Sequence, residues 1–285
     1  MLYEHFLVTR FNLRAGNWKT TRTGINVLTD SWLKNRFRIF EEYCLPCVAG
    51  QTNQNFRWLL FFDSATPPSY KDRIMELKAR HGFIEPRFID SMDQFQPGIL
   101  KRINESPAEY IITSRLDNDD SISMDYVDQV QQQFDSQDFE AIDIVDGYVL
   151  SLQGDKALFG QKRQLNNPFI SLIERNTERL RSVWFQSHAS WKKIARVRRI
   201  YNRPLWFSII HGENLVNRFD ATRPADLPKV LERFTLPSAV KEGILSKAAP
   251  PGAWTGLRLK NRLRSIEGYY LTLFKMKLRH MLATW

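Results

Sequence analysis

Three aspartates within four positions are the residues of this sequence best suited to chemistry. Asp117, Asp119 and Asp120 follow the apolar, β-branched segment 110–113, which reads as a buried strand. Asp117 and Asp119 are two positions apart, so their side chains point the same way in extended backbone. Two carboxylates that close repel each other, and a divalent cation such as Mg²⁺ or Mn²⁺ relieves this while it accepts phosphate oxygens. The pair therefore indicates a metal site for a nucleotide diphosphate.

Two other interpretations fit an acidic cluster of this kind. The aspartates and Asn118 can form a polar turn that caps a helix beginning near Ser121, and for Asp120 alone this is as good as a functional role. A calcium-binding EF-hand loop needs Gly at its sixth position and Glu at its twelfth. Ile122 and Asp128 stand there instead, so that pattern is excluded.

An alternation of strands and helices positions the cluster. Strand patterns cover 6–9, 56–63, 83–90 and 109–116, and helical patterns cover 31–49, 70–81, 99–104 and 124–134. Asp30 is expected to cap the first helix and Pro46 to kink it. This order predicts a mostly parallel sheet with helices on both faces, whose ligands lie beyond the carboxyl ends of the strands. Asp63 ends the second long strand and is expected at that edge.

The pattern loosens after Gly154. Residues 141–152 read as a strand pair or one long strand, 161–169 as a loop, 170–181 as a helix and 205–210 as a short strand before His211. Small helices are expected over 224–251. We predict a nucleotide-binding α/β part over 1–153, an acceptor-binding part over 154–222 and a C-terminal helical extension over 223–285.

Composition is that of a globular protein, with 43% hydrophobic and 25% charged residues and a net charge of +10. A basic chain favours acidic partners, such as nucleotide phosphates, nucleic acid or an anionic membrane surface. The first residues lack the pattern of a signal peptide, and no apolar run approaches the ~20 residues that cross a bilayer. A cytoplasmic location is expected. Cys44 and Cys47 form a Cys-x-x-Cys motif late in a helix, where buried thiols are expected rather than a redox pair or a zinc site.

The C-terminal stretch 257–284 is both basic and apolar. A basic amphipathic helix of this kind can lie on an anionic membrane surface, at the inner face of the cell membrane. It can equally pack on the domain with its lysines and arginines in solvent. Both interpretations stay open on the sequence.

Several segments resemble known transferases. The segment 44–52, which ends in Gln51-Thr52, and the strand that ends in Asp63 resemble the opening of inverting glycosyltransferases of family two. The Asp-x-Asp-Asp at 117–120 stands where that family carries its metal-binding DxD motif. More closely, 113–120, 167–174 and 206–214 resemble the bacterial rhamnosyltransferases. The resemblance covers roughly residues 5–220 and is moderately specific in its order and spacing.

The resemblance implies a GT-A fold, a Rossmann-like α/β sheet that binds a nucleotide sugar, and a looser acceptor-binding half. The nucleotide-binding residues it implies are Thr9, Arg10, Asp63, Arg115 and Asp117, with Asp63 on the pyrimidine base. Asp119 would be the main ligand of Mn²⁺ or Mg²⁺. His211 precedes Gly212, as a metal-binding histidine does in several GT-A enzymes, and a purely structural histidine is the alternative.

The implied reaction moves a sugar, such as rhamnose from dTDP-rhamnose, to a glycan or lipid-linked acceptor in polysaccharide biosynthesis. A base must take the proton of the acceptor hydroxyl. The family usually carries a Glu-Asp pair for this step, and the pair is missing here. Glu174 is the predicted base, with Glu213 and His188 behind it. The alternative is that Glu174 is a solvated acid on an exposed helix face.

Two non-enzymatic classes compete with this hypothesis. The basic run 192–199 and the aromatic content fit a nucleic-acid-binding protein, yet the basic runs avoid the predicted acidic edge and no known nucleic-acid motif is present. We therefore expect no nucleic-acid partner. A non-catalytic membrane-surface module, anchored by 257–284, is the other alternative.

Overall fold

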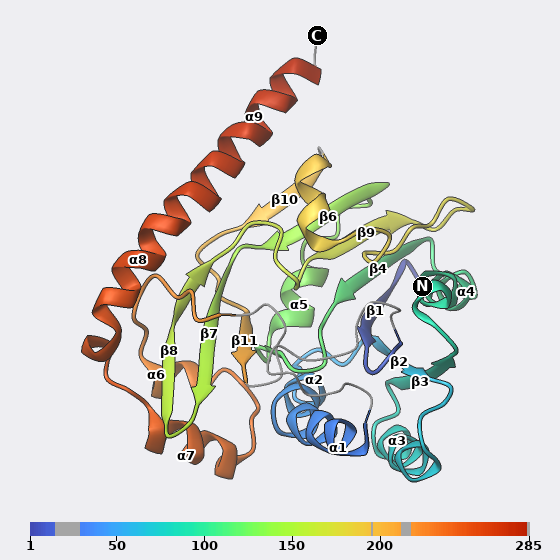
Figure 1. Ribbon diagram of the computed structural model, residues 1–285. Helices are drawn as coiled ribbons and strands as arrows, with labels where there is room; N and C mark the ends of the chain where they lie inside the picture. The colour runs from blue at the N-terminus through green and yellow to red at the C-terminus, as the bar shows by residue number, and fades with distance from the viewer. Residues whose placement is uncertain (15–28, 195, 212–217, 284–285) are drawn as a thin grey trace.

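A mostly parallel sheet forms the centre of the fold. The computed structural model describes residues 1–14, 29–194, 196–211 and 218–283. Within them, seven strands pair in the order β10-β6-β9-β4-β1-β2-β3 (Figure 1). Their bounds are β1 Tyr3–Arg10, β2 Arg57–Asp63, β3 Ile84–Ile89, β4 Tyr110–Arg115, β6 Phe139–Ile144, β9 Ser171–Arg175 and β10 Val197–Ile200. Only β9 runs antiparallel to its neighbours, β4 and β6. The predicted mixed α/β class is confirmed.

Helices cover both faces of this sheet. Side chains of β2 alternate: Trp58, Leu60 and Phe62 belong to one apolar cluster, and Leu59 and Phe61 to another. The first cluster includes residues of α1 Asp30–Ile39, α2 Leu45–Ala49, α3 Pro68–Arg80 and α5 Tyr126–Gln131. The second includes one face of α4 Phe95–Ile103, which follows the short 3₁₀ helix η2 Met92–Gln94. A strand covered on both sides needs the unbroken apolar run that made β2 easy to predict.

The first helix is continuous but changes its winding. A π-helical segment, η1 Phe40–Cys44, joins α1 to α2. Such a bulge accommodates Pro46, which cannot donate a backbone hydrogen bond at the start of α2. The N-cap is Thr29, whose hydroxyl accepts a hydrogen bond from the Trp32 amide, so the prediction of Asp30 was wrong by one position. Cys44 and Cys47 are buried, and burial raises the pKa of both thiols, that of Cys47 to about 12.

A second, smaller sheet lies beside the first. Its order is β5-β11-β7-β8, with bounds β5 Ser121–Ile122, β7 Asp146–Gln153, β8 Lys156–Arg163 and β11 Trp206–Ile210. The chain leaves the main sheet at Ile144 and enters the second at Asp146, so the strand pair predicted over 141–152 is confirmed. A Cβ on Gly147 would lie 2.0 Å from the Trp206 ring, so only glycine fits there. Both sheets draw strands from both sides of residue 153.

Three sequence-based predictions were wrong. Residues 170–181 contain strand β9 rather than a helix, because the segment is inserted between β4 and β6 and takes its hydrogen bonds from them. The loop predicted over 161–169 begins later, since β8 extends to Arg163. The capping alternative placed a helix start near Ser121, but β5 lies there, paired to β11; the helix predicted over 124–134 is present as α5, which begins at Tyr126. In each case a distant partner strand overrides the local pattern.

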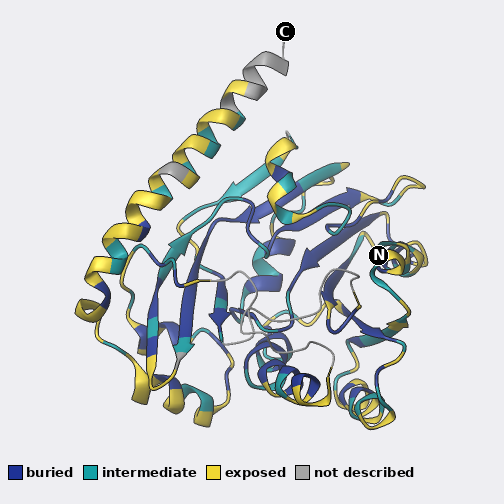
Figure 2. Ribbon diagram, viewed as in Figure 1, coloured by how far each residue is buried: buried dark blue, intermediate teal, exposed yellow. Residues whose placement is uncertain are grey.

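The chain ends in a long helix that extends beyond the body of the molecule (Figure 1). The preceding elements are η3 His188–Lys193, α6 Leu227–Leu231, α7 Ser238–Lys247 and η4 Pro251–Trp254. The long helix comprises α8 Thr255–Ser265, the π-helical η5 Ile266–Leu271 and α9 Thr272–Ala283. It is exposed over most of its described length (Figure 2). In the part of the chain that the structure describes, no helix has the length and apolar character to cross a bilayer.

Candidate functional site

The carboxyl ends of β1, β2 and β4 bring the predicted residues to one edge of the main sheet. These strands are parallel neighbours, with Val8 opposite Arg115 and Arg10 opposite Phe61. Arg10 ends β1, Asp63 ends β2, and the acidic turn 117–120 follows β4. Parallel strands in a row place these ends together by necessity. The structure therefore confirms that these residues lie at one edge of the sheet, as the sequence predicted.

Asp119 is held between two basic side chains. Its Oδ2 lies 2.9 Å from Nη1 of Arg36 and 3.1 Å from Nε2 of His211. Burial alone would raise the pKa of Asp119, but the Arg36 charge and the hydrogen bond from His211 outweigh it and lower that pKa well below the usual range. Asp119 is therefore an anion, placed beside the histidine that the sequence singled out 92 residues away.

The pKa of Asp120 is shifted in the opposite direction. It is 3% exposed, and its Oδ1 accepts a hydrogen bond of 3.0 Å from the Ile209 amide in β11. Burial, and then the charges of Asp119 and Asp117, raise the pKa of Asp120 well above its usual value. A raised pKa at one carboxyl beside a lowered pKa at its neighbour is the usual result when like charges lie close together. Asp120 ties the main sheet to the second sheet.

Two arginines lie against one tryptophan that the sequence analysis missed. The guanidinium carbons of Arg115 and Arg10 lie 3.9 Å and 5.4 Å from the ring centroid of Trp184. Nη2 of Arg115 is also 3.4 Å from Oδ2 of Asp117. Burial lowers the pKa of Arg115. The stacked cations give this acidic edge a positive side, which suits a phosphate group.

The side chains of Asp63 and Thr9 both accept hydrogen bonds from other residues of the protein. Asp63 accepts hydrogen bonds from Nε of Arg14 at 2.6 Å and from the Ala65 amide at 2.8 Å. Thr9 is fully buried, and its hydroxyl accepts from Nε1 of Trp58 at 2.9 Å. Asp63 therefore lies at the edge, whereas Thr9 lies beneath it.

Glu174 is not brought to this edge. It stands opposite Ile111 and Phe139, at the starts of β4 and β6. Ile111 is four residues from Arg115, about 13 Å along the strand. The Glu174 carboxylate accepts hydrogen bonds from the amides of Arg181 and Ser182 at 2.9 and 2.8 Å, and burial raises its pKa to about 7. Glu174 therefore lies neither on an exposed helix face nor beside Asp117. Its two hydrogen bonds stabilise the turn after β9.

His188 lies closer to the acidic edge than Glu174 does. Its Nδ1 is 2.8 Å from the carbonyl oxygen of Asn166. Burial lowers its pKa most, and the charges of Arg115 and Asp117 also act on it. Its ring lines a cavity of about 740 Å³ next to the second sheet. Glu213, the other alternative for the base, lies outside the described residues.

The side chains at the edge fit a divalent cation in part. Asp119 and His211 converge on one point, and an oxygen and an imidazole ligand together suit Mn²⁺. Among the described residues no cluster of three or more such ligands occurs. A Mg²⁺ or Mn²⁺ site of this kind is usually completed by water and substrate phosphates. The residues present therefore fit a cation that arrives together with a diphosphate.

Comparison with known proteins identifies a family match. A family model described as “Putative rhamnosyl transferase” matches residues 4–223. This range includes both sheets and every predicted site residue. No curated protein matches the sequence.

Solved structures share a general likeness. S. aureus TarS (residues 1–349) is similar over 72% of this chain, with 12% identity and a TM-score of 0.41, and the match covers 60% of that solved chain. The mannosyltransferase PcManGT from Pyrobaculum calidifontis, solved with GDP-Man and Mn²⁺, is similar over 99% of this chain and 81% of its own, with 11% identity and a TM-score of 0.43. Similarity at this level is weak, so the family match carries the assignment.

Proposed function

The chain belongs to the rhamnosyl transferase family of glycosyltransferases, and on this premise we propose that it moves a sugar from a nucleotide-diphosphate donor to an acceptor hydroxyl. Rhamnose, from dTDP-rhamnose, is the first sugar to test. The acceptor is a glycan or a lipid-linked sugar in the synthesis of a bacterial polysaccharide. The observation that carries the proposal is the ionised Asp119, held at the sheet edge between Arg36 and His211.

The arginines of this edge support a diphosphate at the site. Nε of Arg36 and Nε of Arg115 are buried donors with no hydrogen-bond partner among the described residues. An unpaired buried donor costs free energy, about 1–3 kcal/mol, and a phosphate oxygen would remove that cost. A bound Mn²⁺ or Mg²⁺, held by Asp119 and His211, would stabilise the negative charge of the leaving diphosphate. Arg115 and Arg10 bind the same charge from the Trp184 side.

Specificity for the nucleotide is assigned to the β1–β2 side of the edge. Asp63 accepts from the base of the nucleotide, and Asp117 contacts the ribose or the cation. Arg14, which pairs with Asp63 at 2.6 Å, is 53% exposed at its side chain and can turn away when a base binds. Thr9 supports the site indirectly, by orienting Trp58 under the strand ends.

We assign the catalytic base to His188 in place of Glu174. A carbonyl oxygen only accepts hydrogen bonds, so the contact with Asn166 places the proton on Nδ1 of His188 and leaves Nε2 with its lone pair. Its lowered pKa keeps the ring neutral at pH 7. Neutral imidazole beside the cavity can accept the hydroxyl proton of an acceptor as the sugar bond forms.

A calorimetric titration tests the donor site. We expect one of dTDP, UDP and GDP to bind in the presence of Mn²⁺ and to lose most of its affinity in EDTA, because the cation joins the diphosphate to Asp119. The pyrimidine nucleotides should bind more tightly than GDP if Asp63 contacts the base. If the folded protein binds none of the three, a non-catalytic module on a transferase-like fold is favoured and the proposal fails.

We further propose that the long C-terminal helix rests on an anionic membrane surface. Its exposed apolar side chains recur every three or four residues and form one stripe: Leu259, Leu263, Ile266, Tyr270, Phe274 and Leu278. Lys260, Arg262 and Lys275 are exposed on the same helix, and Arg258 is half-buried. An apolar stripe with flanking cations is complementary to acidic lipid headgroups.

Vesicle pelleting tests this contact. The protein should pellet with phosphatidylglycerol vesicles and less with phosphatidylcholine vesicles. The double variant Leu263→Ser, Phe274→Ser should lower pelleting about tenfold, since each removed side chain contributes about 2 kcal/mol when fully inserted and part of that here. The exposed Met75→Ser on α3 is the matched control. Equal pelleting of both variants would exclude the stripe as the anchor.

A further inference from the structure

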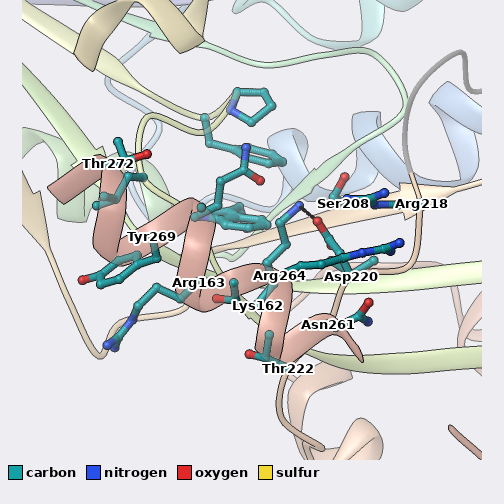
Figure 3. A pocket seen from close by; sticks show the side chains of 18 of the residues that line it. Lys162, Arg163, Ser208, Arg218, Asp220, Thr222, Asn261, Arg264, Tyr269 and Thr272 are labelled. Carbon is teal, nitrogen blue, oxygen red and sulfur yellow. Dashed lines mark ion pairs between the residues drawn. The ribbon is translucent and has the colours of Figure 1, made fainter. Parts of the chain in front are cut away.

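A cavity of about 740 Å³ lies between the second sheet and the C-terminal helix (Figure 3). Strands β7, β8 and β11 supply one wall, and α8, η5 and the start of α9 supply the other. The helix is fixed over the sheet by Asn261, whose side-chain amide donates to the carbonyls of Phe219 and Ala221 at 3.2 and 3.0 Å. Asn261 is 3% exposed, so this attachment is internal. The cavity is thus a built feature of the fold.

The wall of the cavity carries an excess of positive charge. Lys162 pairs with Asp220 at 2.9 Å, and Arg163 pairs with Asp146 through two hydrogen bonds of 2.8 and 3.0 Å. Arg218 and Arg264 also line the cavity, and neither has an ion pair within the described part of the chain. Figure 3 shows both arginines beside the Lys162–Asp220 pair. Two guanidinium groups without a carboxylate partner suit a phosphate ester.

The same wall offers hydrogen-bond acceptors and an aromatic surface. Oδ1 of Asp220 is buried and has no hydrogen-bond partner among the described residues. Trp206 and Phe169 line the cavity but are stacked on each other, with ring centroids 4.8 Å apart, and each is only 1% exposed; the half-buried Tyr269 of the helix offers the accessible ring. A carboxylate oxygen without a donor can accept a hydrogen bond from a sugar hydroxyl. An aromatic ring nearby can pack against the face of the sugar.

Strand β11 connects this cavity to the donor site. Its residues 206, 208 and 210 line the cavity, while the amide of Ile209 binds Asp120 and His211 binds Asp119. His188 lines the cavity as well, and Asp117 and Arg115 act on its pKa. A molecule in the cavity would therefore lie beside the proposed base and against the strand that contacts Asp119 and Asp120.

We propose that this cavity binds the acceptor, and that the acceptor carries a phosphate or diphosphate ester held by Arg218 and Arg264. This inference rests on the proposed function and adds the class of acceptor. Asp220 accepts a hydroxyl of the acceptor sugar, and the reacting hydroxyl is presented to Nε2 of His188. Arg264 and Tyr269 lie outside residues 4–223, the range that the family model matches. The C-terminal helix of this chain would thus set which acceptor is used.

Calorimetry with two phosphate esters tests the proposal. Farnesyl diphosphate represents a lipid-linked acceptor, and glucose 1-phosphate represents a phosphorylated glycan. Each is titrated into the whole chain while the donor site is saturated with the nucleotide that binds in the titration proposed above. We expect at least one to bind. Arg218→Gln and Arg264→Gln should each weaken that binding by about tenfold or more, because a charged hydrogen bond is lost. Arg80→Gln, which removes an exposed charge on α3 and does not line the cavity, should leave the affinity within about twofold.

The outcomes separate the two proposals. Tighter binding of farnesyl diphosphate identifies a lipid-linked acceptor, and tighter binding of glucose 1-phosphate a phosphorylated glycan; both support the assignment. Binding of neither ester, or equal effects of Arg264→Gln and Arg80→Gln, overturns it. Nucleotide affinity should be the same in Arg264→Gln as in the wild type, so a failure of this proposal leaves the donor site intact. A protein without nucleotide binding fails the proposed function instead.

Discussion

Replacing Asp119 by Asn is expected to lower kcat/KM on the order of a thousandfold, the largest effect of any single change at this site. Asn keeps the size of the side chain and one oxygen for Arg36 and His211, which contact Oδ2 at 2.9 and 3.1 Å. It removes the charge that we propose to bind the cation. Metal-dependent nucleotide binding should disappear in the same variant, as measured by calorimetry and by initial rates.

A matched control separates this effect from unfolding. Asp72 is exposed on α3, away from the sheet edge, so Asp72→Asn removes one carboxylate without touching the site. Circular dichroism should show Asp119→Asn folded, with a loss of stability on the order of 1–3 kcal/mol because the buried Arg36 loses its ionic partner. Turnover of Asp119→Asn within tenfold of the wild type would show that Asp119 binds no essential cation.

The second large effect is expected at His188. His188→Asn places a side-chain amide where Nδ1 lies, so the hydrogen bond to the Asn166 carbonyl can be kept while the Nε2 lone pair is lost. We expect kcat to fall by about 10²–10⁴-fold, the usual contribution of a general base, with a small change in KM. Glu174→Gln, at the far end of β9, should keep most of the activity per folded molecule.

The pH profile of the wild type gives an independent reading. A base works only when it is unprotonated, and burial lowers the pKa of His188 from its usual 6.5. Activity should therefore be full at pH 7 and fall as the pH drops through that lowered pKa, with a midpoint below 6.5. The residual activity of His188→Asn should lack this acid limb. If His188→Asn has an unchanged kcat, or keeps the same acid limb, another group is the base.

Sequence patterns predict the half of the main sheet that contains β1, β2 and β4 well, for a physical reason. Strands β1, β2 and β4 are covered on both faces, so their apolar runs are unbroken and their ends are marked by Arg10, Asp63 and Arg115. Parallel order then forces those ends together without any knowledge of side-chain contacts. His211 was singled out because it follows an apolar strand, and the pairing of β11 with β5 brings it to Asp119.

The features that were missed depend on contacts between distant parts of the chain. Ile170, Leu172 and Ile173 fit a helical face as well as a strand, and only the pairing with β4 and β6 decides between them. Arg36 lies 83 residues before its partner Asp119, with no motif to connect the two. The sequence does contain one signal for Arg36: it occupies a position on the apolar face of the helix 31–49, where an arginine needs a partner.

The antiparallel insertion of β9 also constrains the order of assembly during synthesis. Strands β1 to β4 can pair as soon as residue 115 is available, but the second edge of β4 bonds only to β9, which ends at Arg175. Strands β6 and β10 are connected to β4 through β9, so they can join the sheet only after β9 has paired. Until then β4, whose six residues are all buried in the finished fold, presents an open apolar edge to other chains. A nascent chain stalled between these two points is therefore the form of this protein most exposed to aggregation.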